Sequence, residues 1–407
     1  MDSSVLHARL EASTPAPDDT LVAPLDSVRL EFSAAVSADL TRLLLVGPQG
    51  DTTVLSAGQA GDGSVILAPL PLLPPGAHEL HWRTTSADGH VLEGTIPFVV
   101  GPTAARAMEE PASAAPDSAP VAATGGNVPG AAPEVSEAAP ANTPALLPLL
   151  RALGTLLLLA LAGGLLFASR AEQAAAALLP TLRWLAIAAP IAIAAELVTW
   201  TTHVAGSLDL AGSLQLATGR ALLARIVFAL TAALVLLLLR SMRGAAVVAL
   251  VAVLAGGSLG HAGAIAPAVS VPLRAVHMAA AAVWLGGLLA LGLTLRNTPA
   301  QRSLLTAVST AALASFVVVA LTGAGQALLL LGSPAALLQT TYGRIVLVKA
   351  TGLLLLAAFG YLHRRMIAVV PEGGDASALR RSVTVETLVF IALILVSGAL
   401  SFAQLPE

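Results

Sequence analysis

Short apolar runs, in which every second residue is polar, recur through the first part of the chain. The clearest of them occupy residues 28–32, 42–46, 64–67, 78–82 and 95–100. Because alternate residues of a strand point to opposite faces, these runs predict strands with one buried and one solvent-facing side. Gly and Pro mark the turns between them, as in Gly61-Asp62-Gly63. Strands at this spacing are typical of a small all-β sandwich, which we place at residues 1–101.

A different pattern begins at Ala145, where apolar runs become long enough to cross a bilayer. We expect about eight transmembrane helices, near residues 146–169, 182–203, 219–240, 244–261, 272–295, 303–331, 343–366 and 382–403. Residues 145–407 are therefore expected to form an all-α, polytopic membrane domain. Residues 102–144 are rich in Ala, Pro, Ser and Gly and contain no aromatic residue, so they are expected to form a flexible linker.

Arginine marks alternate loops of the expected membrane domain. The residues concerned are Arg170, Arg183, Arg240, Arg243, Arg296, Arg302, Arg364, Arg365, Arg380 and Arg381. Since cytoplasmic loops carry an excess of Lys and Arg, these loops are predicted to face the cytoplasm. The sandwich and the C-terminus are then expected on the extracytoplasmic side.

The composition agrees with a membrane protein and argues against several functions. Hydrophobic residues make up 56% of the 407 residues and charged residues only 11%, which is more apolar than an ordinary soluble protein. The formal charge of −3 is too small to indicate nucleic acid as a partner. No phosphate-cradling Gly loop and no Ser-His-Asp order stands out, so we expect a chain that is not an enzyme.

The stretch from Trp82 to His90 carries the most specific chemistry. Asp88 and His90 are two residues apart, so in extended chain their side chains point to the same side, and Gly89 lets the backbone bend between them. A carboxylate and an imidazole at this spacing can converge on one metal ion. The third ligand is expected to be His7, if the first strand lies beside the last hairpin of the sandwich.

Several motifs in this part of the chain resemble the periplasmic copper-binding family CopC. They are His7-Ala8-Arg9-Leu10 followed by Ser13-Thr14-Pro15-Ala16-Pro17, then Val28-Arg29-Leu30-Glu31-Phe32-Ser33, then Trp82-Arg83-Thr84-Thr85-Ser86-Ala87-Asp88-Gly89-His90, and finally Gly94-Thr95-Ile96-Pro97-Phe98. The resemblance implies a Greek-key sandwich of cupredoxin or immunoglobulin-like type that binds copper. In that family the first ligand histidine also binds through its amine. Residues 1–6 precede His7 and lack a signal-peptide pattern, so either the true start lies upstream or the amine ligand is lost.

The residue types present favour Cu(II) as the metal. The chain has no Cys and only 5 Met, which leaves no thiolate trap and no Met-rich Cu(I) tract, whereas His and Asp suit Cu(II). His78 and His81 lie on the strand before the turn. We expect both on the solvent-facing side of the sheet rather than on the metal.

Ionisable side chains inside the expected spans are candidates for functional residues, because burying a charged group in lipid is costly. Candidates for a copper path in the outer half of the membrane are Glu196, His203, His261 and His277. Only His363 lies near the inner face. Competing interpretations stay open: His203 and His261 can be interfacial residues bonded to backbone or water, and Glu196 and Glu386 can pair with Arg344 or Lys349.

Further motifs, from about residue 200 onward, resemble the copper membrane protein family CopD. They are Arg274-Ala275-Val276-His277, Ala282-Val283-Trp284-Leu285-Gly286-Gly287, Leu321-Thr322-Gly323, Thr341-Tyr342-Gly343-Arg344 with Lys349, and Arg380-Arg381-Ser382 before Glu386. The resemblance implies inward movement of copper across the bacterial inner membrane. A copper chaperone on either side of the membrane is an expected partner.

Copper import is the function favoured by the sequence, with the sandwich capturing Cu(II) and the helical domain passing copper inward. Two alternatives are a membrane-anchored copper buffer that gives resistance without transport, and a b-type haem membrane reductase. Glu196 and His277 count against a mere anchor, and the single inner His363 counts against a haem pair near each face. We expect His277→Ala to abolish copper accumulation and His363→Ala to do much less.

Overall fold

The computed structural model describes residues 8–86, 89–102, 144–260, 266–299, 301–331, 333–369 and 374–402. The chain divides into a sandwich unit, His7–Asn142, and a helical unit that holds Thr143–Glu407. Each unit is described by itself. The linker predicted at residues 102–144 falls almost wholly outside the described residues.

Two β-sheets make up the sandwich unit. Its strands are β1 (Leu10–Thr14), β2 (Asp19–Leu21), β3 (Ser27–Phe32), β4 (Arg42–Val46), β5 (Thr52–Leu55), β6 (Gly58–Ala60), β7 (Val65–Pro69), β8 (Gly76–Thr85) and β9 (Val91–Val100). One sheet has the order β1-β3-β7-β6 and the other the order β2-β9-β8-β4-β5. All pairs are antiparallel except β2 with β9. The strands predicted from alternation are confirmed as β3, β4, β7, β8 and β9.

The sandwich core lies between the two sheets, and alternation along each strand supplies it. Leu30 of β3 and Leu80 of β8 are both fully buried, and the Phe32 and Trp82 rings meet edge to face at 5.5 Å. The four strands that alternation did not predict, β1, β2, β5 and β6, bury little; in β5 only Leu55 is buried. Such short, exposed strands carry no clear hydrophobic period.

The helical unit consists of long apolar helices joined by short connections. Its helices are α2 (Leu146–Ala168), α3 (Glu172–Ala205), α4 (Leu210–Ser213), α5 (Ala217–Leu237), α6 (Met242–Ala255), α7 (Pro267–Asn297), α8 (Arg302–Leu331), α9 (Ala336–Gln339), α10 (Thr341–Val369) and α11 (Ser377–Leu400). Within the described residues, 7 are long and apolar enough to cross a membrane. The chain is therefore a multi-pass membrane protein.

Two of the expected spans differ from the structure in length. The fourth, expected near 244–261, is the 14-residue helix α6, which at 1.5 Å per residue is about 21 Å long and short of a ~30 Å hydrocarbon layer. The second, expected from residue 182, is the 34-residue helix α3, which continues through Pro180 and Pro190. Membrane helices tolerate proline because neighbouring groups can satisfy the freed backbone.

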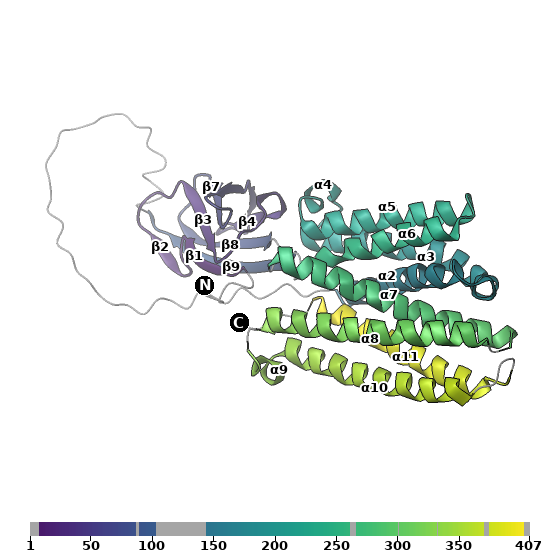
Figure 1. The fold of residues 1–407 in the computed structure, drawn as a ribbon. Coiled ribbons are helices and arrows are strands. Elements are labelled where there is room, and N and C mark those ends of the chain that lie inside the picture. The colour runs from purple at the N-terminus through teal and green to yellow at the C-terminus, as the bar shows by residue number, and fades with distance from the viewer. Residues whose placement is uncertain are drawn as a thin grey trace. The chain divides into compact units, whose positions relative to one another are not determined.

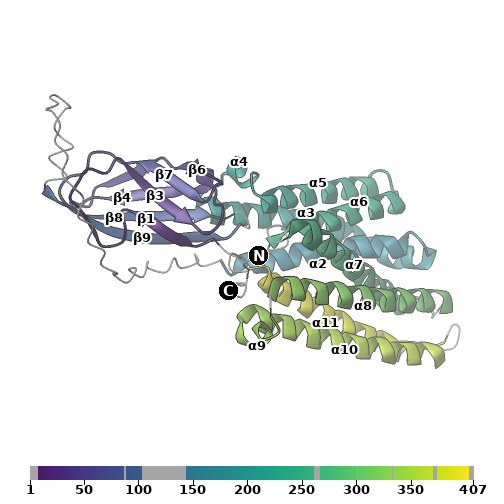
Figure 2. The ribbon, with the colours of Figure 1, turned by 60° about the vertical axis from the view of Figure 1, so that its left-hand side comes forward.

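Helix α2 lies at the centre of the helical unit and packs against α3, α6, α7 and α11; Figures 1 and 2 show these helices side by side. Gly163 of α2 meets Gly286 of α7 so closely that a Cβ on either would collide with the other helix. Small residues allow this approach between membrane helices. Helices α4 and α9 lie at one end of the unit, which we call the α4/α9 end (Figure 1). The opposite end contains Arg170, Arg240 and Arg364, and we call it the arginine end.

Candidate functional sites

The turn between β8 and β9 fixes the backbone at His90. Ser86 donates to the His90 carbonyl from its N–H at 2.9 Å and from its hydroxyl at 3.1 Å. Gly89 has a φ of 88°, a left-handed conformation that glycine adopts without strain. The backbone bend expected at Gly89 is thus confirmed, while the predicted ligands Asp88 and His7 lie outside the described residues.

The residues that follow His7 lie near this turn. Ser33 donates from its N–H to the Arg9 carbonyl at 2.9 Å, and Val36, three residues on, forms a β-bridge with Ser86. Three residues of extended chain span at most about 11 Å, so Arg9 and Ser86 lie at the same end of the sandwich. This is the arrangement that a shared site of His7 and His90 requires. The ligand set itself stays a prediction.

The two histidines of β8 have different environments. His78 is 2% exposed, stacks on Phe98 with 5.4 Å between ring centroids, and its Nε2 lies 2.9 Å from the Pro74 carbonyl. The expectation that His78 faces solvent is wrong, because the two-residue period of a strand puts it on the same inward side as Leu80. His81 does face outward, with Glu79 Oε2 at 3.2 Å.

Glu196 of α3 forms an ion-pair network with two arginines. Arg151 Nε lies 2.5 Å from Glu196 Oε1 and Arg225 Nη1 lies 3.9 Å from Oε2. All three side chains are at most 4% exposed, and Arg225 also donates to Thr155 at 3.2 Å. The carboxylate thus connects α2, α3 and α5. Because two arginines engage it, this arrangement argues against our expectation that Glu196 lies on the copper path. An arginine inside each of the apolar helices α2 and α5 indicates a buried charge that needs a partner, but it does not indicate which acid that partner is.

Two of the three predicted outer histidines, His203 and His277, lie in described helices. Within the described residues, no three His, Asp or Glu side chains come together, so Glu196, His203 and His277 are not a ligand cluster. His203 lies near the end of α3 and makes polar contacts of its own. His261 lies outside the described residues. The role of these histidines in a copper path stays a prediction.

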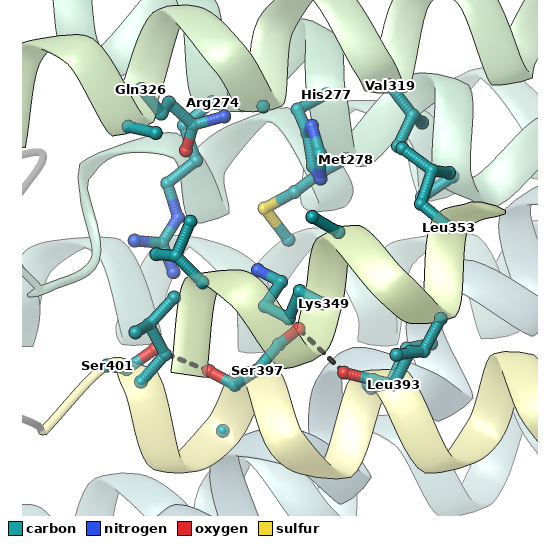
Figure 3. A pocket seen from close by; sticks show the side chains of 18 of the residues that line it. Arg274, His277, Met278, Val319, Gln326, Lys349, Leu353, Leu393, Ser397 and Ser401 are labelled. Carbon is teal, nitrogen blue, oxygen red and sulfur yellow. Dashed lines mark hydrogen bonds between the residues drawn. The ribbon is translucent and has the colours of Figure 1, made fainter. Parts of the chain in front are cut away.

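A cavity of about 490 Å³ opens among α2, α7, α8, α10 and α11; we call it the large cavity. Its polar lining includes Arg151, Arg274, His277, Gln326, Lys349 and Ser397. Figure 3 shows the side chains of Arg274, His277 and Lys349 around it. The His277 Nδ1 lies 2.9 Å from the Thr322 hydroxyl. Arg274 and His277 lie in the first third of α7, so this cavity is in the half of the unit toward the α4/α9 end.

A second cavity, of about 250 Å³, lies among α7, α8, α10 and α11 in the other half; we call it the small cavity. His363 lines it, with its Nδ1 2.9 Å from Glu386 Oε2 and its Nε2 2.8 Å from the Ser382 hydroxyl. Both His363 and Glu386 are buried. From the sequence we expected only His363 near this face, but the arginine half of the helical unit contains a buried pair of His363 with Glu386.

Trp284 and Leu356 line both cavities, so the cavities adjoin at these two residues. The indole Nε1 of Trp284 donates to Glu386 Oε1 at 3.0 Å. Its ring meets Phe390 and Phe316 edge to face, at 5.6 and 6.1 Å. Trp284 is thus a fixed aromatic partition between the two cavities.

Two known families match separate parts of the chain. The family described as "CopC domain" matches residues 10–101, and "Copper resistance protein D" matches residues 302–400. The second match is shorter than the CopD resemblance of the sequence motifs, and it leaves His277 and Trp284 outside. It does include His363 and Glu386, the polar pair of the small cavity.

Curated relatives match the sandwich unit. Copper resistance protein C of Xanthomonas campestris pv. juglandis is 31% identical over 106 residues, 24% of this chain and 83% of that protein. Protein YobA of Escherichia coli (strain K12) is 28% identical over 97 residues, 23% of this chain and 78% of that protein. The crystal structure of CopC from Methylosinus trichosporium OB3b is 28% identical, covers 23% of this chain and 94% of that one, and has a TM-score of 0.23. The chain therefore belongs to the CopC family, and it carries a Copper resistance protein D domain in the same polypeptide.

Proposed function

We propose that this protein captures copper with its sandwich unit and passes it inward across the bacterial inner membrane through its helical unit. One observation carries the proposal: a CopC domain and a Copper resistance protein D domain occupy a single chain. A soluble capture domain joined to a multi-pass unit with polar cavities is more than a membrane anchor needs, since one apolar helix would suffice to anchor it.

The copper captured outside is proposed to be Cu(II), held by His7, Asp88 and His90. Imidazole and carboxylate suit this ion. The short path from Arg9 through Ser33 and Val36 to Ser86 supports the convergence of His7 with the β8–β9 turn. The fixed backbone at His90 would position one ligand before the metal arrives, which lowers the entropy lost on binding.

The route through the membrane is proposed to follow the two cavities past Trp284. Among the described residues, each cavity offers one imidazole, His277 in the large cavity and His363 in the small one. His203, in the last turn of α3, and His261, which lies outside the described residues, keep a proposed place at the entrance. Glu196 has no place in this route because two arginines engage it.

The proposed orientation rests on the arginines of alternate loops. Loops rich in Lys and Arg face the cytoplasm, so the arginine end would be inside, and the sandwich unit and the C-terminus outside. Copper would then be received from an extracytoplasmic chaperone or from solution, and delivered to an acceptor in the cytoplasm.

We further propose that the chain performs no reaction of its own, because its polar groups fit passage and binding. A haem reductase would need histidine pairs for iron. Among the described residues, His363 is the only histidine that lines the small cavity. The purified protein should therefore show no Soret absorbance, and a strong Soret band would contradict this part of the proposal.

The deciding experiment is uptake of radiolabelled copper into membrane vesicles of known orientation, with and without the protein. Inward transport predicts faster accumulation than in vesicles that lack it. Unchanged accumulation, with copper still bound to the sandwich, would instead identify a copper buffer. Reduced accumulation would show outward movement and overturn the proposed direction.

A further inference from the structure

The large cavity carries an excess of positive charge that no acidic side chain of the described residues balances. Arg151, Arg274 and Lys349 all line it. Arg151 pairs with Glu196, and Arg225 shares the same carboxylate. The other buried acid of the described helices, Glu386, pairs with His363 and bonds to Trp284.

Arg274 and Lys349 have no carboxylate of the described residues within ion-pair distance. The two lie close enough to each other and to His277 for their charges to interact. Uncompensated charges inside a membrane protein are costly and mark functional sites. A bound anion would supply the missing negative charge and accept hydrogen bonds from both side chains.

The walls of the cavity are apolar at the other end. Trp284, Leu356 and Phe390 form that end. Arg274 and Trp284 are ten residues apart on α7, which places them about 15 Å apart along the helix axis. This is close to the extended length of a medium-length alkyl chain. The cavity therefore offers two cations at one end and a hydrophobic surface at the other.

We propose that the large cavity binds an amphipathic anion. Arg274 and Lys349 hold its acidic group, and its apolar part lies against Trp284, Leu356 and Phe390. The acidic group can belong to an anionic membrane lipid or to a free organic acid. Both share the chemistry that the cavity recognises.

This site goes beyond copper transport but bears on it. Two unbalanced cations beside His277 would repel an incoming copper ion. An anion bound to Arg274 and Lys349 would remove that repulsion and leave the imidazole accessible to metal. The anion site does not depend on this coupling, and its test is carried out without copper.

The probe is radiolabelled dodecanoate, bound to the full chain in an uncharged detergent. Dodecanol, which has the same chain without the charge, is the competitor. One molecule of dodecanoate should bind per chain. Dodecanol should bind more weakly by a factor on the order of ten or more, because charge-assisted hydrogen bonds contribute that much to affinity. Equal competition by dodecanol would overturn the proposal.

Substitutions locate the site. Arg274→Gln and Lys349→Gln should each weaken dodecanoate binding on the order of tenfold, while Lys349→Arg retains it. Arg344→Gln is the matched control. Arg344 lies in the first turn of α10, the helix that carries Lys349, but it is exposed and lies outside the cavity lining. Dodecanoate brominated at its far end should quench Trp284 fluorescence, and Trp284→Phe should remove that quenching. Unchanged binding by both Gln variants would contradict the assignment, and so would quenching that Trp284→Phe leaves intact.

Nanodiscs identify the source of the anion. If phosphatidylglycerol in the disc displaces dodecanoate and phosphatidylcholine does not, the natural ligand is an anionic lipid. If neither lipid displaces it, the site takes a free acid. Both results support an anion site, whereas equal displacement by both lipids would show that the cavity recognises only apolar chains.

Discussion

At the scale of single residues, His90 is the proposed copper ligand whose backbone position the structure defines. Its carbonyl is held by Ser86 and the turn is set by Gly89. We predict that His90→Ala lowers Cu(II) affinity by at least about tenfold, because one of three protein ligands is lost. Spin resonance of the copper complex should lose one nitrogen coupling.

The matched control is His81→Ala, on the outward side of β8 in the same hairpin. It should leave both the spectrum and the affinity unchanged. Removal of copper by a chelator should abolish the signal in every variant. If His90→Ala binds Cu(II) like the unaltered protein, the site lies elsewhere in the sandwich.

The two cavity histidines give a second prediction at this scale. His277→Ala should abolish copper accumulation in vesicles, because it removes the only imidazole lining the large cavity among the described residues. The structure also revises our expectation for His363→Ala. Since His363 lines the small cavity beside Glu386, we now expect this substitution to be comparably damaging.

Both variants should keep normal Cu(II) binding by the sandwich unit, which serves as their control for expression. His363→Ala with normal accumulation would show that copper leaves the path before the small cavity. Normal accumulation by His277→Ala would remove the large cavity from the route.

At the scale of elements, Glu196 holds three helices together through Arg151 and Arg225. Glu196→Gln would leave both guanidinium groups buried without a counter-charge. Breaking a buried pair in this way typically destabilises a protein by about 3–5 kcal/mol. We therefore predict a clear loss of thermal stability of the detergent-solubilised protein.

Glu172→Gln is the control on the same helix, since Glu172 is exposed at the start of α3. It should leave the melting temperature nearly unchanged. If Glu196→Gln is as stable as the control but fails to accumulate copper, Glu196 is a transport residue after all, as the sequence first indicated.

The elements themselves were largely predictable from the sequence, but their partners were not. Alternation and turn residues located β3, β4, β7, β8 and β9, and long apolar runs located the membrane helices, since both signals are local. The partners of Glu196 are 45 and 29 residues away from it, and the sequence offers no local signal that selects Arg151 and Arg225 over Lys349.

The same limit applies to the candidate site. The turn at Gly89 follows from the conformational freedom of glycine, and the exposure of His81 follows from strand periodicity. The same periodicity, applied to His78, also gives its burial. The cavities could not be predicted, because each is bounded by residues from at least four helices. The pairing of His363 with Glu386 likewise depends on how α10 packs against α11.

At the scale of the whole molecule, the proposed function assigns copper capture to the sandwich unit and copper passage to the helical unit. A capture domain raises the local copper concentration at the membrane. This increase affects the uptake rate only when the free copper concentration is below the one that saturates the helical unit. Tethering by a linker sets that local concentration without requiring a fixed docking position. The sandwich unit should therefore lower the copper concentration needed for half-maximal uptake and leave the maximal uptake rate unchanged.

We accordingly predict that a chain shortened to residues 143–407 accumulates copper at the full rate when copper is abundant and much more slowly when it is scarce. His90→Ala in the full chain should reproduce this loss at low copper, because it removes the metal site and keeps the sandwich. Initial uptake rates over a range of copper concentrations measure both. Should the shortened chain be equally slow at every concentration while His90→Ala is normal, the sandwich acts on the helical unit itself and not as a copper donor.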